Sequence, residues 1–181
     1  NFYGTFGRNT GLLTYLSLAL LLLISATIRN LNSFRFLLWS LLIAGFVNVA
    51  YCLWVVIFGD FIPWTNPYKN ILGTLGNPNF IGAFLGIFIS VYFAYLLHPG
   101  VRLIYRGVGI CVLLIAMYEV KASHAVQGIV VSAGGVAIVG YFFIRSRTKR
   151  EIIPGLYALA VSAVGLVAVL GALQKGPLTS I

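Results

Sequence analysis

A dense group of polar side chains in this sequence lies in the segment EVKASHAVQG. Lys121, Ser123, His124 and Gln127 fall there within about two helical turns. A lysine can neutralise a phosphate, and a histidine can exchange a proton near neutral pH. No carboxylate follows His124 at the spacing of a catalytic dyad, so the histidine alone is more typical of a membrane interface than of a general base. The cluster predicts a small polar pocket but specifies no reaction.

A second polar segment, GDFIPWTNPYKNILGTLGNPN, spans residues 59–79 and holds three of the six prolines. Long connections of this kind are usually functional or disordered, and the aromatic residues here favour an ordered segment at a membrane surface. Residues 76–79 have the composition of a tight turn, in which we expect Asn79 to be the N-cap of the next helix. Asn77 and Asn79 either orient polar groups of a ligand or simply hold this turn.

Near the start of the chain, TFGRNTG places Arg8 and Asn9 just before the first apolar run. An exposed guanidinium can bind a phosphate through two parallel hydrogen bonds. The alternative interpretation of Arg8 is an interface arginine that extends its charge to the lipid headgroups.

The composition decides what kind of scaffold must position these residues. Apolar residues make up 60% of the chain and charged residues 8%, with a mean hydropathy of +1.00, whereas soluble domains have about 25% charged residues. We therefore expect an integral membrane protein with no soluble globular domain. The net charge of +9 does not indicate nucleic acid, because the basic residues lie in short connections between apolar runs. Cys52 and Cys111 lie inside apolar runs without metal-ligand spacing, so we expect no metal, no disulfide and no cofactor.

A hydrocarbon core of roughly 30 Å needs about 20 apolar residues per helix. The sequence predicts an all-α, polytopic bundle of transmembrane helices, a single domain over 1–181. Its six spans are predicted at 11–28, 36–58, 80–97, 103–118, 125–144 and 154–173. Only helices satisfy every backbone group over runs of this length in lipid.

Glycines mark where these helices can approach closely. Gly82 and Gly86 have the spacing of the GxxxG motif, and Gly134, Gly135 and Gly140 follow in the fifth predicted span. We interpret these glycines as ordinary helix packing.

The basic residues predict the orientation. Eight lie in alternate connections: Arg29, Arg35, Arg102, Arg106, Arg145, Arg147, Lys149 and Arg150. The other connections and the two chain ends hold Arg8, Lys69, Lys121 and Lys175. By the positive-inside rule the first group faces the cytoplasm, so both chain ends and both polar segments lie on the non-cytoplasmic side.

Four segments, taken in order, resemble the O-antigen ligase family: TFGRNTGLLTYLSL, PWTNPYKNILGTLGNPNF, SHAVQG and QKGPL. The resemblance covers nearly all of the chain, and the second segment is its most specific part. It implies an α-helical enzyme of the bacterial inner membrane. Such an enzyme takes a glycan from an undecaprenyl diphosphate carrier on the outer face and joins it to an acceptor.

Residue by residue, Arg8 and Asn9 match the family's GRN, residues 76–79 match its GNPN turn, and Ser123 with Gln127 matches an SxxxQG variant. Many relatives carry arginine near the last position, where this chain has Gln127. Family members are also longer, and their essential Arg and His residues lie in a large outer loop. The tail QKGPL looks like the start of that loop. We therefore expect a piece of a longer protein, with the catalytic residues unknown and outside this sequence.

The sequence thus predicts a membrane glycosyltransferase resembling O-antigen ligases. Its partners would be membrane lipids and a polyprenyl diphosphate-linked glycan. The candidate substrate-binding residues are Arg8, Asn9, Asn77, Asn79, Lys121, Ser123, His124 and Gln127. One alternative is a non-catalytic membrane subunit of a larger assembly. A weaker alternative is a transporter or channel, because no predicted span carries a central ionisable residue that could relay ions.

Overall fold

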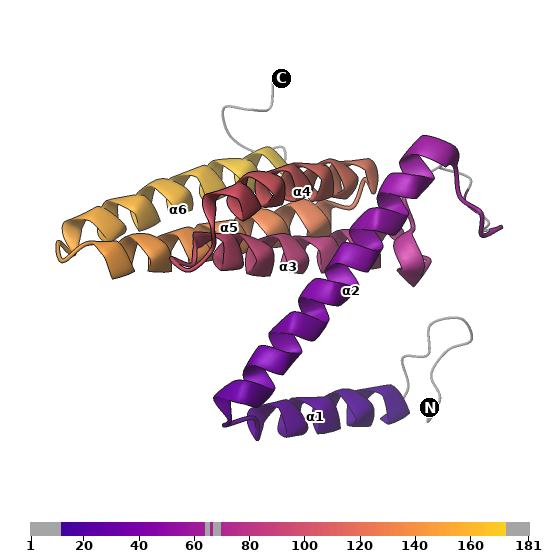
Figure 1. The fold of residues 1–181 in the computed structure, drawn as a ribbon, viewed down its shortest axis with the longest axis horizontal. Helices are drawn as coiled ribbons and strands as arrows, with labels where there is room; N and C mark the ends of the chain where they lie inside the picture. Colours follow the sequence, from indigo (N-terminus) through magenta and orange to yellow (C-terminus); the bar gives the residue numbers. More distant parts are fainter. Residues whose placement is uncertain (1–11, 64–65, 67–69, 173–181) are drawn as a thin grey trace. The chain divides into compact units, whose positions relative to one another are not determined.

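A computed structural model describes residues 12–63, 66 and 70–172 (Figure 1). Within these residues every regular element is a helix and none is a strand, which confirms the predicted all-α class. The elements are α1 (Leu12–Ala26), α2 (Leu31–Phe58), the short 3-10 helix η1 (Gly73–Leu75), α3 (Pro78–Leu97), α4 (Leu103–Ala122), α5 (Val126–Arg147) and α6 (Ile152–Ala172).

Four of these helices, α2, α3, α4 and α5, are long and apolar enough to cross a membrane. The chain is therefore an integral membrane protein built from helical spans. Two shorter apolar stretches, Tyr15–Ala26 in α1 and Ile152–Ala168 in α6, coincide with the first and last predicted spans. Membrane crossing by these two helices stays a prediction.

Several helices extend beyond their predicted ends, into polar sequence. α2 begins at Leu31 and so includes Arg35, α4 continues to Ala122, and α5 continues to Arg147. The predicted bounds concern membrane spans and mark where apolar sequence stops, so the spans themselves stay predictions. Backbone hydrogen bonding continues through the membrane interface, where long charged side chains reach water from a helix.

The N-cap of α3 was predicted at Asn79, and this prediction was wrong by two residues. Asn77 has an extended backbone (φ −147°, ψ 127°), and its side-chain oxygen accepts a 2.9 Å hydrogen bond from the Asn79 N–H. Pro78 then occupies the first helical position, where its fixed φ suits the helix and its missing N–H is not needed. Asn77 is therefore the cap, and Asn79 is inside the first turn.

The described residues form two compact units, divided between Leu41 and Leu42. The first contains α1 and the beginning of α2, whose first turn is capped by Asn30: the Asn32 N–H donates to its side-chain oxygen at 3.0 Å. Most side chains of this unit are exposed, as expected for helices whose solvent is lipid.

The second unit contains the core, and α3 is its most buried helix. Ile81, Leu85, Phe88 and Ile89 are fully buried. The Phe88 ring packs against Gly45 and edge-to-face against Phe46, both from the later part of α2, with 5.2 Å between the Phe46 and Phe88 ring centroids. This core surrounds α3, on which α4 and α5 pack.

α3 and α5 pack tightly along a seam of small residues and lie side by side (Figure 1). A Cβ atom added to Gly128 would lie 2.8 Å from the carbonyl carbon of Gly82, and one added to Gly86 would lie 3.0 Å from the backbone N of Ser132. Farther along, Gly135 faces Ser90. These contacts advance in the same direction along both helices, so α3 and α5 run parallel and their N-termini share one end of the unit.

α4 and α6 complete the second unit around this pair. Gly109 of α4 packs against Leu96, and the Tyr157 hydroxyl of α6 donates to the Ala137 carbonyl of α5 at 3.2 Å. α4 lies between α3 and α5 in sequence and returns the chain from one end of the unit to the other.

We predict that Gly128→Ala lowers the midpoint of thermal unfolding in detergent, because its methyl group would meet the α3 backbone. Overpacking of this kind costs typically about 1–3 kcal/mol. Gly134→Ala is the matched control, since a Cβ there meets nothing within 4 Å and alanine favours a helix by up to about 1 kcal/mol. The midpoints are measured by scanning fluorimetry. Equal midpoints for the two variants would contradict the close packing of α5 on the α3 backbone at Gly128.

Candidate functional site

The structure brings two of the predicted polar segments together at the start of the α3–α5 pair. A Cβ atom added to Gly82 would lie 2.9 Å from the Ser123 hydroxyl oxygen and 2.8 Å from the Cβ atom of Ala125. Gly82 is in the first turns of α3, directly after residues 76–79, and Ala125 is the N-cap of α5. We call this place, formed by residues 76–79 and 121–127, the polar end.

The turn before α3 depends on two glycines with left-handed backbones. Gly73 has φ 61° and Gly76 has φ 65°, and the Gly76 N–H donates to the Gly73 carbonyl at 3.4 Å. Thr74 in the same turn is held by Asn48 of α2, whose side-chain oxygen accepts from the Thr74 hydroxyl at 2.8 Å. The turn is therefore fixed from both sides, and the capping role of Asn77 is structural. The side chain of Asn79 is exposed, so it is the asparagine of this pair that can meet a ligand.

Ser123 is buried and ties the α4–α5 turn. Its hydroxyl donates to the Val120 carbonyl at 2.7 Å and accepts from the Ala125 N–H at 3.3 Å. With its proton engaged inside the protein, Ser123 positions the turn instead of facing a ligand.

His124 adopts a left-handed backbone, with φ 54°. A residue with a Cβ atom costs roughly 1–2 kcal/mol there, and it persists where surrounding structure determines the conformation. Here the α3 backbone at Gly82 lies close to Ser123 and Ala125, the residues on both sides of His124. The imidazole is consequently directed out of the packed seam, and His124 is exposed.

Lys121 and Gln127 are exposed on either side of this turn. Lys121 is in the last turn of α4, and Gln127 is in the first turn of α5. Ala125 supplies no side-chain cap to α5, so the first N–H groups of that helix have no side-chain acceptor. Each helix N-terminus carries about half a positive charge. The first turn of α3 is already capped by Asn77 and begins with a proline, so the uncapped first turn of α5 and Lys121 are the groups that favour an anion.

Glu119 follows the fourth predicted span directly, and its prediction in a connection was wrong because α4 continues past it. It is fully buried on α4, and neither carboxyl oxygen has a hydrogen-bond partner among the described residues. The buried Cys52 thiol is close enough to interact electrostatically with the Glu119 carboxyl. Burying a carboxyl without partners is unfavourable. Ala116 and Ser123, three and four residues away on the same helical face, are buried with it.

An apolar groove opens between α4 and α5 beside the polar end. It encloses about 280 Å³, and Lys121 stands among its lining residues together with Met117, Val120, Ile129, Ser132, Ala133 and Val136. Hydrocarbon with a negatively charged end suits such a groove, because the apolar walls and the lysine are neighbours.

The remaining predicted residues, Arg8 and Asn9, lie outside the described part of the chain, as does Lys69. Among the residues that are described, no three His, Cys, Asp or Glu side chains are grouped so that they could hold a metal ion. The polar end is thus defined by Asn79, Lys121, His124 and Gln127 as exposed groups, with Asn77 and Ser123 as its structural supports.

No protein-family model, curated protein or solved structure matches this chain. The fold defines the class as an α-helical integral membrane protein. Anything finer must be argued from the polar end and its groove.

We predict that Glu119→Gln raises the thermal unfolding midpoint by a few degrees, because an amide of similar volume removes a buried group whose ionised form is unfavourable there. Glu151→Gln is the control, since Glu151 is exposed and its loss should leave the midpoint unchanged. A lower midpoint for Glu119→Gln would show instead that a cationic group pairs with this carboxylate in the folded protein.

Proposed function

We propose that this chain is part of a membrane glycosyltransferase resembling the O-antigen ligases, which moves a glycan from an undecaprenyl diphosphate carrier to an acceptor. The observation that supports the proposal is the polar end. Two parallel helix N-termini meet there over Gly82 and Gly128, beside a groove that has Lys121 among its lining residues. A lipid diphosphate combines the two properties that this arrangement can accommodate, a hydrocarbon tail and a concentrated negative charge.

In this reaction an acceptor hydroxyl attacks the anomeric carbon of the glycan. The bond from that carbon to the diphosphate oxygen breaks, the diphosphate leaves with the bonding electrons, and the hydroxyl proton passes to a base. Negative charge on the leaving group grows in the transition state, so cationic and N–H groups aimed at it accelerate the step. Lys121 and the first turn of α5 would carry this role, with Arg8 as a further cation.

The neutral polar groups would orient the substrate. Gln127 and Asn79 present exposed amides at the start of α5 and α3, and an amide can both donate to and accept from phosphate and sugar oxygens. Gln127 stands where many members of the family have arginine, so in this chain Lys121 would supply charge that an arginine supplies elsewhere.

The proposed site faces the non-cytoplasmic side, and the proposed location is the bacterial inner membrane. α5 is 22 residues long, which corresponds to about 33 Å at 1.5 Å per residue, close to the thickness of the hydrocarbon core. It begins at the polar end and ends in the basic sequence Arg145 to Arg150. The positive-inside rule assigns that basic sequence to the cytoplasm, which supports the outward orientation of the polar end.

A non-catalytic membrane subunit is the second candidate. Among the described residues of the polar end, no exposed carboxylate accompanies His124, and the nearby Glu119 is buried. The polar end therefore offers charge and hydrogen bonds without an acid–base pair. A scaffold that only presents a lipid-linked substrate to another subunit would need no more than this.

We predict that Lys121→Gln lowers glycan transfer by about tenfold. One lost charge-assisted contact to the leaving diphosphate costs about 1.5 kcal/mol or more, and 1.36 kcal/mol corresponds to tenfold in rate. The assay uses membranes containing the intact protein and a radiolabelled, undecaprenyl diphosphate-linked glycan.

Lys149→Gln is the matched control, because it removes an equally exposed lysine from the other end of α5 and should leave transfer unchanged. Unaltered transfer by the Lys121 variant would refute its assigned role. Absence of transfer by the unmodified protein, together with retention of the lipid-linked glycan, would favour the subunit.

A further inference from the structure

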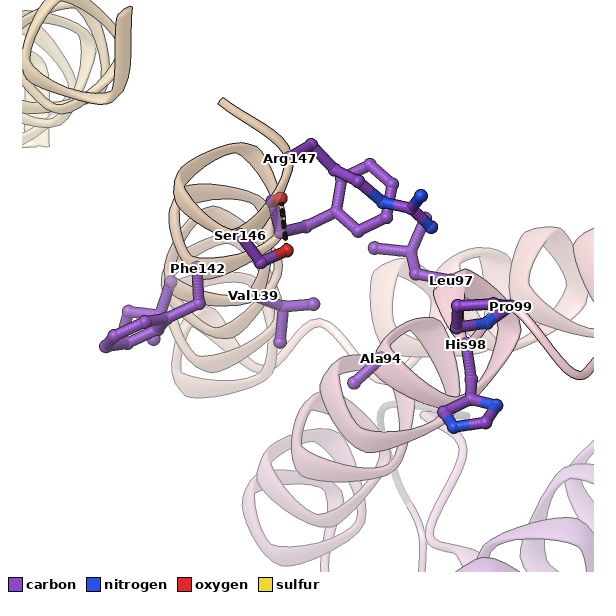
Figure 2. A pocket seen from close by; sticks show the side chains of 10 residues that line it. Ala94, Leu97, His98, Pro99, Val139, Phe142, Ser146 and Arg147 are labelled. Atoms are coloured by element: carbon purple, nitrogen blue, oxygen red, sulfur yellow. Dashed lines mark hydrogen bonds between the residues drawn. The ribbon is translucent and has the colours of Figure 1, made fainter. Parts of the chain in front are cut away.

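A second hollow lies at the opposite end of the α3–α5 pair, where both helices finish (Figure 2). It encloses about 490 Å³. Leu97 from α3 and Val139 and Phe142 from α5 form apolar walls, while His98 and Arg147 stand at its polar rim. We call it the basic-end hollow.

The sequence explains why the helices leave space here. The close seam relies on Gly82, Gly86 and Gly135, whose missing side chains let the two backbones touch. After Gly135, α5 continues with Val139 and Phe142, which are too large for such an approach. α3 also stops at Leu97 while α5 continues to Arg147, so the last turn of α5 has no α3 turn beside it.

The polar groups of the rim are available for an anion. The Arg147 guanidinium lies 5.3 Å from the centroid of the Phe143 ring, and no hydrogen bond or ion pair engages it among the described residues. In Figure 2 it extends from α5 toward the α3 side of the hollow. The Nδ1 atom of His98 accepts from the Gly100 N–H at 3.1 Å, which leaves Nε2 for another partner. The Ser146 hydroxyl is used within α5, where it donates to the Phe143 carbonyl at 2.7 Å.

The surroundings of the hollow are strongly basic. Arg145, Lys149 and Arg150 are exposed in the same stretch of chain, against one nearby acid, Glu151. Arg106 from α4 donates to the His98 carbonyl at 3.0 Å, so it stabilises the rim and adds a further positive charge. Charge complementarity therefore selects an anionic occupant, and the apolar walls select one that carries hydrocarbon.

We propose that the basic-end hollow binds an anionic membrane phospholipid. Its phosphate would lie between Arg147 and His98, and an acyl chain would lie along Leu97, Val139 and Phe142. A basic pocket at the end of neighbouring transmembrane helices is a known way to recognise such headgroups. Ile138 and Phe142 are exposed on α5, a helix long and apolar enough to cross a membrane, so an acyl chain would reach the walls without crossing water. The site is independent of the polar end and of glycan transfer.

The test uses the purified protein in nanodiscs that contain phosphatidylcholine and phosphatidylglycerol in equal amounts. Native mass spectrometry then counts the lipids that remain bound to the protein after the protein is released from the nanodisc. We expect phosphatidylglycerol to be retained several-fold over phosphatidylcholine. Arg147→Gln should abolish this preference, because the guanidinium is the arginine side chain that lines the hollow, at its rim.

Arg150→Gln is the control for general attraction, since it removes the same charge from the same stretch but does not line the hollow. It should keep the preference, whereas Val139→Trp, which narrows the hollow and leaves every charge in place, should reduce lipid retention. Inorganic phosphate in excess should not displace the lipid.

Three results would overturn the proposal. Equal losses in the Arg147 and Arg150 variants would indicate a diffuse basic surface. Displacement by inorganic phosphate would indicate a site for a soluble anion. A cross-link between two copies of the chain through the hollow, with no lipid retained, would indicate a protein contact.

Discussion

The contact between the backbones of α3 and α5 is the constraint on which the rest of the second unit depends. In lipid there is no hydrophobic force to join two helices, so close packing of small residues has to supply the attraction. Gly82, Gly86 and Gly128 allow that packing, and Gly135 continues it against Ser90. Because the contact is parallel, both helix N-termini come to one end and both C-termini to the other.

These two ends differ in chemistry for the same reason. At the N-terminal end, tight packing forces the α4–α5 turn into a compact shape, with His124 in a left-handed backbone and Ser123 buried beneath it. At the C-terminal end the seam has already stopped, and larger side chains leave a hollow between the helices. Both ends favour negative charge, the first through helix dipoles and Lys121, and the second through arginine side chains.

Hydropathy was enough to predict the helical class and the positions of the helices, because the need to satisfy backbone groups in hydrocarbon acts on every residue. The GxxxG spacing correctly predicted a close approach at Gly82 and Gly86, and Gly135 and Gly140 also contact neighbouring side chains. Gly134 does not. The pairing of α3 with α5 could not be predicted, since it depends on which surfaces fit one another and not on the composition of either helix.

The polar residues were harder to predict than the apolar ones. A hydropathy boundary at residue 118 assigned Glu119 to a connection, while the structure continues α4 and buries the carboxyl. The cap was predicted at Asn79 instead of Asn77 because Pro78 is equally compatible with a turn and with the first residue of a helix. At such positions a shift of two or three residues decides whether a side chain supports the site or faces a ligand.

The most direct test of this account asks whether the α3–α5 pair crosses the membrane with its polar end outside. Single cysteines replace Asn79 and, in a second variant, Lys149, both exposed, in a background in which Cys52 and Cys111 are substituted. Intact cells are treated with a membrane-impermeant maleimide before and after permeabilisation. The account predicts labelling at position 79 in intact cells and labelling at position 149 only after permeabilisation. Labelling of both positions from the same side would contradict it, and the reverse pattern would overturn the orientation.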